Sequence, residues 1–334
     1  MAKHVIYEGN DNMKQVTVII PNWNGIRYLE KCLDALLLQQ GFFDMIVVDN
    51  GSTDGSVELL QGKYPSVKTI LLKENTGFCH ACNVGIEASD TPYVILLNND
   101  TEVLPGFVEN LVKAIEKDET IFSVGAQMLQ IQNQSLIDSA GDMYTLMGWG
   151  YSRGKVKPAA GYDKPVKIFS ACGGAAIYRK SILDKIGLLD ENHFAYMEDM
   201  DLGYRARIYG YTNLYEPSAN VIHAGSASSG SRYNEFKTKL SAANNAYMIG
   251  KNMPLLQFVI NFPFLFVGVI IKAIFFARKK MGLLYLKSYL SGIARNFSEE
   301  GKKHKISFKM ANLKNYLVIE KELICSVFQL FRKY

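Results

Sequence analysis

The sequence predicts an α/β protein with a mostly parallel sheet flanked by helices, followed by a helical C-terminal region. Between Val16 and Leu129, short β-branched runs alternate with helical patterns, which is typical of a βαβ series. The runs are almost continuously apolar, as expected for strands buried on both faces of a parallel sheet. From Pro254 the composition changes sharply to long apolar stretches.

Each of the first four predicted strands of this series is followed by a helix. The strands are expected at residues 16–21, 45–50, 67–72, 93–100 and 121–129, and the helices at 25–40, 54–63, 78–88 and 105–117. An apolar residue recurs every three or four positions in the first helix, which gives one stripe that can pack on the sheet. The stripe consists of Ile26, Leu29, Leu33 and Leu36.

The pattern is less regular beyond Gln130. Gly and polar residues from Asp138 to Lys164 predict a long excursion over the surface. A regular pattern begins again with a predicted strand that is interrupted by Gly173 and Gly174. We expect an N-terminal extension (1–15), an α/β domain (16–250, with halves 16–130 and 131–250) and a helical region (254–334).

Composition excludes several classes of protein. The chain has 334 residues and a formal net charge of +5, and its basic residues do not form one interleaved basic and aromatic face, so we expect no nucleic-acid partner. The five scattered cysteines suggest no disulfide framework. The N-terminal stretch has no apolar core of a signal peptide, so we expect a protein that starts and works in the cytoplasm.

Polar residues follow three of the predicted strands. Because the carboxyl ends of parallel strands lie at one edge of the sheet, these residues can converge on one ligand. Locally, the stretch DNGSTDGS is equally consistent with a turn and a helix cap. The residues are Pro21, Asn22 and Asn24, then Asp49 and Asn50, and finally Asn98, Asn99 and Asp100.

Asp100 is the candidate for a metal ligand. The chain lacks the Gly-rich motifs of dinucleotide and P-loop sites, so phosphate has to be bound in another way. A carboxylate at a strand end can hold Mg²⁺ or Mn²⁺, which bridges to substrate phosphates. The alternative, that Asp100 caps the next helix, is weaker because Pro105 marks that helix start.

A second acidic group, Glu198, Asp199 and Asp201, lies in the stretch YMEDMDLGYRAR. Such acids can simply compensate the dipole of a helix start. However, Asp199 shares a helix face with the apolar stripe of Leu202, Ala206 and Tyr209, so it faces inward, where loss of hydration favours a general base. Asp201 is four residues before Arg205 and can pair with it.

His223 ends a predicted strand and is followed by a Ser/Gly run that reaches Arg232. A histidine in this position is either structural or a metal ligand. The Ser/Gly run is either a flexible lid that contacts phosphate or a linker.

Six stretches together resemble the family 2 glycosyltransferases of the GT-A fold, in the bacterial rhamnosyltransferase-like branch. They occur in family order and at family distances. They are VTVIIPNWNG, IVVDNGSTDGS, NTGFCHACNVGI, VILLNNDTEV, CGGAAIYRK and MEDMDLGYRAR.

The resemblance implies an inverting transfer of a sugar from a nucleotide diphosphate donor to a hydroxyl group. Asp199 would deprotonate the acceptor, and Asp100 would bind the metal of the D-x-D element, in which Asn98 replaces the first Asp. His223 would assist the metal or the diphosphate, and Glu198, Gly173 and Gly174 would lie on the acceptor side. The donor-binding residues would be Pro21, Asn22, Asn24, Asp49, Asn50, Asn75, Gly77, Asn83, Asn98 and Asn99.

In this reading, residues 16–130 form the nucleotide-sugar-binding half and 131–250 the acceptor-binding half. Resemblance to the branch suggests dTDP-rhamnose as the donor, with UDP-hexoses as the alternative. The Q-x-x-R-W element of processive synthases is missing, since the tryptophans are Trp23 and Trp149, and this favours single addition.

The C-terminal region is expected to associate with a membrane. Leu255 to Ala277 is long enough to span one, but the basic cluster Arg278 to Lys280 follows it, against the positive-inside tendency. We therefore expect this segment to lie in the cytoplasmic leaflet, bent at Pro263.

Two later amphipathic helices are expected to bind an anionic membrane surface, or alternatively to pack as a soluble bundle. A lipid-linked saccharide acceptor would explain such anchoring. The expected apolar faces are Leu283, Leu286, Leu290 and Ile293 in one helix, and Tyr316, Leu323, Val327 and Leu330 in the other.

Other functions are also compatible with parts of the pattern. A sugar-phosphate nucleotidyltransferase would need a Gly-rich, Arg-containing loop where this chain has PNWNG. A non-catalytic saccharide- or nucleotide-binding module tethered to a membrane would tolerate the loss of Asp199. A two-carboxylate hydrolase is less consistent with an acid cluster suited to metal and phosphate.

Overall fold

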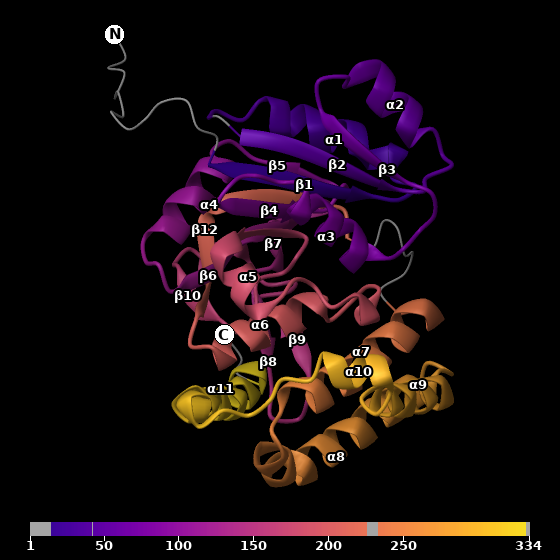
Figure 1. Ribbon diagram of the computed structural model, residues 1–334, viewed down its shortest axis with the longest axis vertical. Coiled ribbons are helices and arrows are strands. Elements are labelled where there is room, and N and C mark those ends of the chain that lie inside the picture. Colours follow the sequence, from indigo (N-terminus) through magenta and orange to yellow (C-terminus); the bar gives the residue numbers. More distant parts are fainter. Residues whose placement is uncertain (1–14, 42, 226–232, 332–334) are drawn as a thin grey trace.

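The computed structural model of the chain describes residues 15–41, 43–225 and 233–331 (Figure 1). The Ser/Gly run expected to act as a lid covers residues 226–232 and lies outside the described residues, as do residues 1–14 of the expected N-terminal extension.

The first part of the chain forms the expected βαβ series. It ends with β5, a short strand that follows Asp100, and α4. The elements are β1 (Val16–Asn22), α1 (Ile26–Leu37), β2 (Phe43–Asn50), α2 (Ser56–Lys63), β3 (Lys68–Leu72), α3 (Phe78–Glu87), β4 (Tyr93–Leu97), β5 (Thr101–Val103) and α4 (Phe107–Glu116).

The middle part adds strands to the same sheet and inserts a small hairpin. Its main elements are β6 (Ile121–Gln130), β7 (Asn133–Ser139), β8 (Asp142–Tyr144), β9 (Gly150–Ser152), β10 (Val166–Ile168), β11 (Ala175–Arg179), α5 (Lys180–Ile186), α6 (Glu198–Ile208) and β12 (Thr212–His223). Short 3₁₀ turns lie at Ala159–Gly161, Glu191–His193 and Met310–Asn312.

The central sheet has the order β10-β12-β6-β11-β4-β1-β2-β3. β1 pairs in parallel with β2 and β4, and β2 with β3, whereas β11 runs antiparallel between β4 and β6. β12 is again parallel to β6, so most strands run in one direction. The predicted α/β fold with a mostly parallel sheet is therefore confirmed.

Helices cover both faces of this sheet. On one face, α1 and α4 pack through Leu29, Leu33 and Phe107. On the other face, α3 and α6 pack through Cys82 and Leu202. The predicted stripe of α1 is buried except for Ile26, which is 40% exposed.

The expected surface excursion from Asp138 to Lys164 is wrong in its first part. There β7 pairs with β6, β8 pairs with β9, and the side chain of Tyr144 is completely buried. Tyr144 packs against Phe169 and Tyr204, so this polar-looking segment contributes to a hydrophobic cluster. Glycine and polar residues interrupt the large apolar residues of this segment, as in Met143, Tyr144, Leu146 and Met147, so the sequence has no long strand-like run.

The remaining helices pack below the sheet (Figure 1). They are α7 (Glu235–Asn252), α8 (Leu255–Ala277), α9 (Gly282–Arg295), α10 (Glu299–Lys303) and α11 (Leu313–Phe331). α8 is long and apolar enough to cross a membrane by length and composition, and only 17% of its most apolar window is buried. Pro263 lies inside this helix.

One predicted membrane-binding face is wrong. Tyr316 and Leu323 of α11 are buried, and together with Val327 they pack in a cluster with Met200 and Tyr204 of α6. The alternative, helix packing on the α/β domain, holds for this face because the outer side of α6 is itself apolar. A different side of α11, with Leu317 and Phe328, is exposed.

A buried ion group joins these helices to the domain. The Lys251 ammonium group of α7 is 2.7 Å from Asp190 Oδ2 and 2.9 Å from Asp201 Oδ2, and all three side chains are at most 2% exposed. Arg205 also pairs with Asp201 at 2.9 Å, as predicted. Although burial opposes it, the charge of Lys251 keeps the pKa of Asp190 at about 2.

Replacing Lys251 with Met should lower the free energy of unfolding by about 3–5 kcal/mol, because two buried carboxylates lose the positive charge that they share. Denaturant titration at pH 7 measures this loss. Lys239→Met, at an exposed position of the same helix, is the matched control and should change stability by less than about 0.5 kcal/mol. Equal stability of the two variants would contradict the importance of the ion group.

Candidate active site

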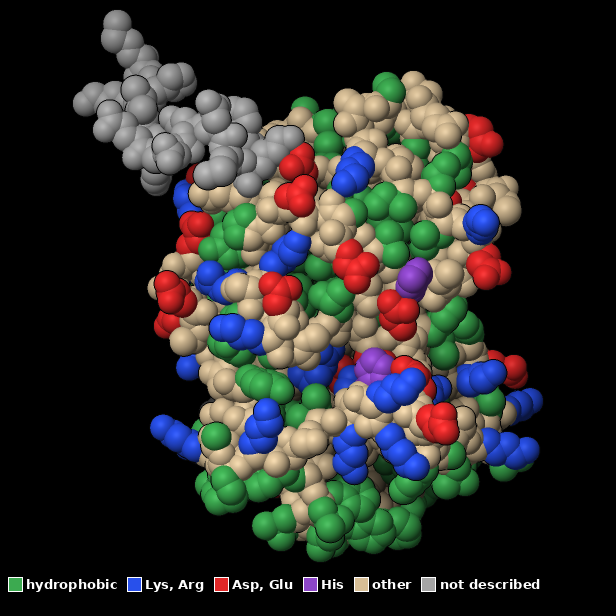
Figure 2. Space-filling view, viewed as in Figure 1, with side chains coloured by type: hydrophobic (Ala, Val, Ile, Leu, Met, Phe, Trp, Pro, Cys, Tyr) green, Lys and Arg blue, Asp and Glu red, His purple; other side chains and the backbone are tan. Residues whose placement is uncertain are grey.

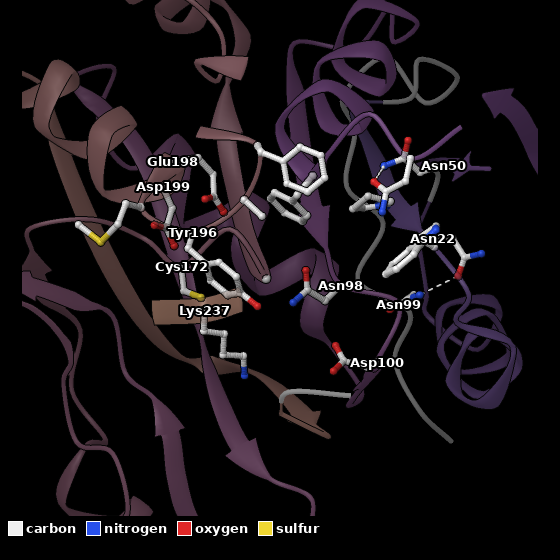
Figure 3. A pocket seen from close by; sticks show the side chains of 18 of the residues that line it. Asn22, Asn50, Asn98, Asn99, Asp100, Cys172, Tyr196, Glu198, Asp199 and Lys237 are labelled. Carbon is white, nitrogen blue, oxygen red and sulfur yellow. Dashed lines mark hydrogen bonds between the residues drawn. The ribbon is translucent and has the colours of Figure 1, made fainter. Parts of the chain in front are cut away.

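A cavity of about 480 Å³ opens at the carboxyl ends of β1, β2 and β4. Figure 3 shows Glu198 and Asp199 on one side of it and Asn22 and Asn50 on the other. Both acids singled out in the sequence, Asp100 and Asp199, line this one cavity. Residues almost one hundred positions apart thus meet in a common site.

Most of the predicted site residues line the cavity, and the others lie behind it. The lining residues are Pro21, Asn22, Asn50, Asn75, Asn98, Asn99, Asp100, Gly174, Glu198, Asp199 and His223. Outside the lining are Asn24, Asp49, Gly77, Asn83 and Gly173.

The residues outside the lining have structural partners. Asp49 accepts a hydrogen bond of 2.8 Å from the Asn22 amide and so orients it. Asn24 accepts from the backbone N–H of Thr53. The Asn83 amide donates to the carbonyl group of Leu189 and accepts from its backbone N–H.

Two positions place backbone groups at the site. The Gly77 carbonyl accepts a hydrogen bond from the Asn50 amide, and a Cβ at Gly77 would meet Phe194 at 2.6 Å. Gly77 also has φ +93°, so only glycine fits this close approach without strain. The Gly173 backbone N–H donates to Asp199 Oδ2 at 3.3 Å.

Hydrogen bonds hold the side chains on the Asn22 side of the cavity in place. Asn99 donates to Asn22 Oδ1 at 2.7 Å, which links the ends of β1 and β4. Asn50 accepts from the backbone N–H and the hydroxyl group of Thr76. Such amide-rich strand ends offer both donors and acceptors to a polar ligand.

Asp100 and His223 lie next to each other. His223 Nε2 is 3.3 Å from Asp100 Oδ1, and His223 Nδ1 is 2.8 Å from Asp138 Oδ2. Lys155 in turn pairs with Asp138 at 2.7 Å. Burial lowers the pKa of His223, but the two carboxylates outweigh it and raise the pKa to about 9.

Asp138 was missed by sequence reasoning because it lies in the segment assigned to a surface excursion. Asp138 binds Nδ1 of His223, and Nε2 of the same ring faces Asp100. Carboxylates commonly orient metal-ligating histidines in this way. The bond from His223 keeps the pKa of Asp138 at about 2 despite burial, so this carboxylate stays ionised.

The Asp199 side is an acid cluster in a dry environment. Asp199 Oδ1 accepts from the backbone N–H of Met200 at 2.7 Å. Burial raises the pKa of Asp199. Burial, followed by the charge of Asp199, raises the pKa of Asp142 to about 7 and that of Glu198 to about 8. Burial and mutual repulsion thus favour the protonated forms in this cluster, and such shifted carboxyl groups are common at functional sites.

Two groups of residues could hold a cation. Ligand atoms of Asp142, Cys172 and Asp199 all lie within 4.8 Å of one another. Burial raises the pKa of the Cys172 thiol, and a protonated thiol is a poor ligand for hard cations. Asp100 with His223 fits Mg²⁺ or Mn²⁺ better, because such an ion keeps waters and takes further oxygens from phosphate.

A strained loop precedes α6. Phe194, Tyr196 and Met197 have φ of 60°, 69° and 72°, a region that non-glycine residues rarely adopt. The Asn244 amide of α7 donates to the carbonyl groups of His193, Ala195 and Tyr196 and so holds the loop. All three strained residues line the cavity.

Sequence reasoning also missed several lining residues from other elements. Trp23, Phe78, Cys172 and Met197 lie inside stretches that carry the family resemblance, but sequence reasoning did not single them out. The others have no motif, because they reach the cavity only through the packing of α7 and the strained loop. They are Phe194, Ala195, Tyr196, Phe236, Lys237 and Ser241.

Known proteins share this sequence pattern and fold. The model of Glycosyl transferase family 2 matches residues 17–187. An N-acetylglucosaminyl-diphospho-decaprenol L-rhamnosyltransferase of Mycobacterium tuberculosis is 29% identical over 232 residues, which cover 61% of this chain and 74% of that protein.

Two solved structures share the fold. GalNAc-T7 with UDP, GalNAc and Mn²⁺ has a TM-score of 0.59 at 16% identity, covering 72% of this chain and 48% of that chain. The mannosyltransferase PcManGT from Pyrobaculum calidifontis, in complex with GDP-Man and Mn²⁺, has a TM-score of 0.51 at 16% identity, covering 97% of this chain and 89% of that chain.

Replacing Asp138 with Asn should lower the pKa of His223 in the metal-free protein by at least about one unit, because one of its two carboxylate partners is lost. NMR titration of the imidazole resonances measures this. The pKa of His223 in the folded protein is higher than the ordinary histidine value of about 6.5. Protonation of His223 therefore contributes fully to the stability of the fold below about pH 6.5. This stabilisation is lost as the pH rises through about 9.

The exposed Asp163→Asn is the matched control and should leave the His223 titration unchanged. An unchanged His223 pKa in the Asp138 variant would show that Asp138 does not act on the imidazole.

Proposed function

The chain belongs to family 2 of the glycosyltransferases, and from this premise we propose that it is an inverting, non-processive enzyme that transfers a sugar to a lipid-linked saccharide. The donor in this proposal is a nucleotide diphosphate sugar, and the acceptor reacts through a hydroxyl group. The observation that carries the proposal is the single cavity lined by Asp100 with His223 on one side and by Asp199 on the other.

The proposed donor is dTDP-rhamnose, with UDP-hexoses as the alternative. Similarity to the mycobacterial L-rhamnosyltransferase supports the sugar. The six ordered motifs of the rhamnosyltransferase-like branch support the same choice. In this proposal the nucleotide lies along Pro21, Asn22 and Asn50.

Asp199 is the proposed general base. Its raised pKa makes the carboxylate a stronger proton acceptor than an exposed aspartate, and the N–H groups of Gly173 and Met200 hold both oxygens in place. Glu198 Oε2 is buried and has no hydrogen-bond partner in the part of the chain that the structure describes. A protonated Glu198 can donate to the acceptor saccharide beside Asp199.

The leaving diphosphate needs positive charge. A Mg²⁺ or Mn²⁺ ion held by Asp100 and His223 would neutralise charge that develops on the diphosphate. Lys237 of α7 lines the same cavity. Burial lowers the pKa of its ammonium group, and the negative charge of Asp100 acts in the opposite direction. Its ammonium group is therefore suited to bind a donor phosphate oxygen.

The proposed location is the cytoplasmic face of the cell membrane, with a peripheral or monotopic attachment. Figure 2 shows hydrophobic side chains gathered at the end of the molecule formed by the C-terminal helices, bordered by Lys and Arg side chains. Leu256, Phe262 and Phe266 of α8 are more than half exposed. Leu283 and Leu290 continue this surface on α9. So large an apolar surface fits lipid contact.

The test of the proposed function is Asp199→Asn. Sugar transfer should fall by about 10²–10⁴-fold, because the amide of Asn cannot take up the proton of the sugar hydroxyl group that attacks the donor. Binding of dTDP-rhamnose, measured by calorimetry with Mn²⁺, should stay within about twofold. Asp184→Asn, at an exposed position of α5, should retain full transfer. Full transfer by the Asp199 variant would refute the proposed base.

A separate prediction concerns Lys237. Lys237→Gln should weaken binding of dTDP by about tenfold or more, because a hydrogen bond to a charged group is worth about 1.5–3 kcal/mol. Binding of thymidine, which has no phosphate, should not change. The exposed Lys239→Gln is the matched control. Equal dTDP affinity of both variants would exclude a phosphate contact at Lys237.

A further inference from the structure

Aromatic side chains extend from the cavity towards α8. Tyr196 and Phe236 line the cavity, and their ring centroids are 6.3 Å apart. Phe236 is 50% exposed although it is a large apolar side chain in the first turn of α7. These two rings therefore form one rim of the site beside Asp199.

The aromatic surface continues three residues before Phe236. The ring of Tyr233 is 5.4 Å from Phe275 and 6.3 Å from Phe276, both near the C-terminal end of α8. Phe276 stacks on Tyr285 of α9 at 5.2 Å and an interplanar angle of 16°. We call Tyr196, Tyr233, Phe236, Phe275, Phe276 and Tyr285 the aromatic row. Its members come from the cavity lining, from the start of α7, from α8 and from α9. Tyr285 is buried, whereas Tyr233, Phe236 and Phe275 are exposed.

A cation lies on this row. The Lys279 ammonium group is 4.5 Å from the centroid of Tyr233 and 5.3 Å from that of Phe275. Arg278 and Lys280 flank it, and all three side chains are exposed. The place where α8 ends thus combines apolar rings with a cluster of positive charge, and Tyr233 of this group lies three residues before Phe236 of the cavity rim.

We propose that the aromatic row and Lys279 form the binding site for the prenyl diphosphate part of the acceptor. This inference rests on the proposed function and names where its lipid-linked substrate binds. The isoprenoid chain would lie on Phe275, Phe276 and the exposed face of α8. Its diphosphate would contact Lys279, and the attached saccharide would pass Tyr196 and Phe236 to reach Asp199.

Charge complementarity and continuity favour this occupant. A prenyl diphosphate is apolar over most of its length and carries its negative charge at one end, next to the sugar. The protein has the same order: an apolar helix, then a cation, then the cavity. Simple attraction to an anionic membrane would depend on the number of positive charges and not on this position.

The experiment is fluorescence titration of the full chain in detergent with farnesyl diphosphate and with farnesol, in EDTA. Lys279→Gln should weaken binding of farnesyl diphosphate by at least tenfold and leave farnesol binding within twofold. Lys287→Gln removes one positive charge from an exposed position of α9 and should change neither ligand's affinity. Tyr233→Leu should weaken both ligands, with circular dichroism confirming the fold.

Three results would overturn the inference. Equal losses in the Lys279 and Lys287 variants would indicate unspecific electrostatic attraction. A loss in Lys237→Gln instead of Lys279→Gln would mean that farnesyl diphosphate occupies the donor region. Absence of binding to the wild-type protein would exclude the site itself.

The same preparations are titrated with dTDP-rhamnose, UDP-glucose and Mn²⁺. If the wild type binds a nucleotide sugar but no farnesyl diphosphate, only the inference about the acceptor fails. If it binds no nucleotide sugar, the proposed function fails together with the inference.

Discussion

One buried ammonium group, that of Lys251, connects the helix that carries Asp199 with the C-terminal helices. It neutralises Asp201, two residues after Asp199, and Asp190, which precedes the strained loop. Without this charge, two carboxylates would be buried with too little compensation, a cost of several kcal/mol. The position of α6, and with it the position of Asp199 in the cavity, therefore depends on a residue of α7.

Two further contacts reinforce the same connection. Asn244 of α7 holds the strained loop, and Arg295 of α9 donates to Asn244 Oδ1 at 3.0 Å and to the carbonyl group of Asn192. Backbone strain persists only where surrounding structure compensates it. The C-terminal helices thus do more than provide an apolar surface, because their inner sides hold the loop that leads into the candidate base.

The two sides of the cavity differ in chemistry because they differ in environment. Asp138 and Asp100 both pair with His223, so negative charge is stabilised on that side. Asp142, Glu198 and Asp199 crowd together in a dry region, where burial and mutual repulsion favour protonation. Such a pair of environments suits a reaction that stabilises an anion at one end and removes a proton at the other.

The sequence by itself determined the α/β fold, the strand-end amides, Asp100 and Asp199, because apolar periodicity and strand-end position depend only on local order along the chain. Tertiary structure alone decided where Asp138, Asn244, Lys237 and the aromatic row lie, because these residues have no local pattern and meet the site through packing. It also decided that Tyr316 and Leu323 face α6 rather than a membrane. An amphipathic helix has the same periodicity whether a protein core or a lipid surface covers its apolar face, so only the packing partner distinguishes the two.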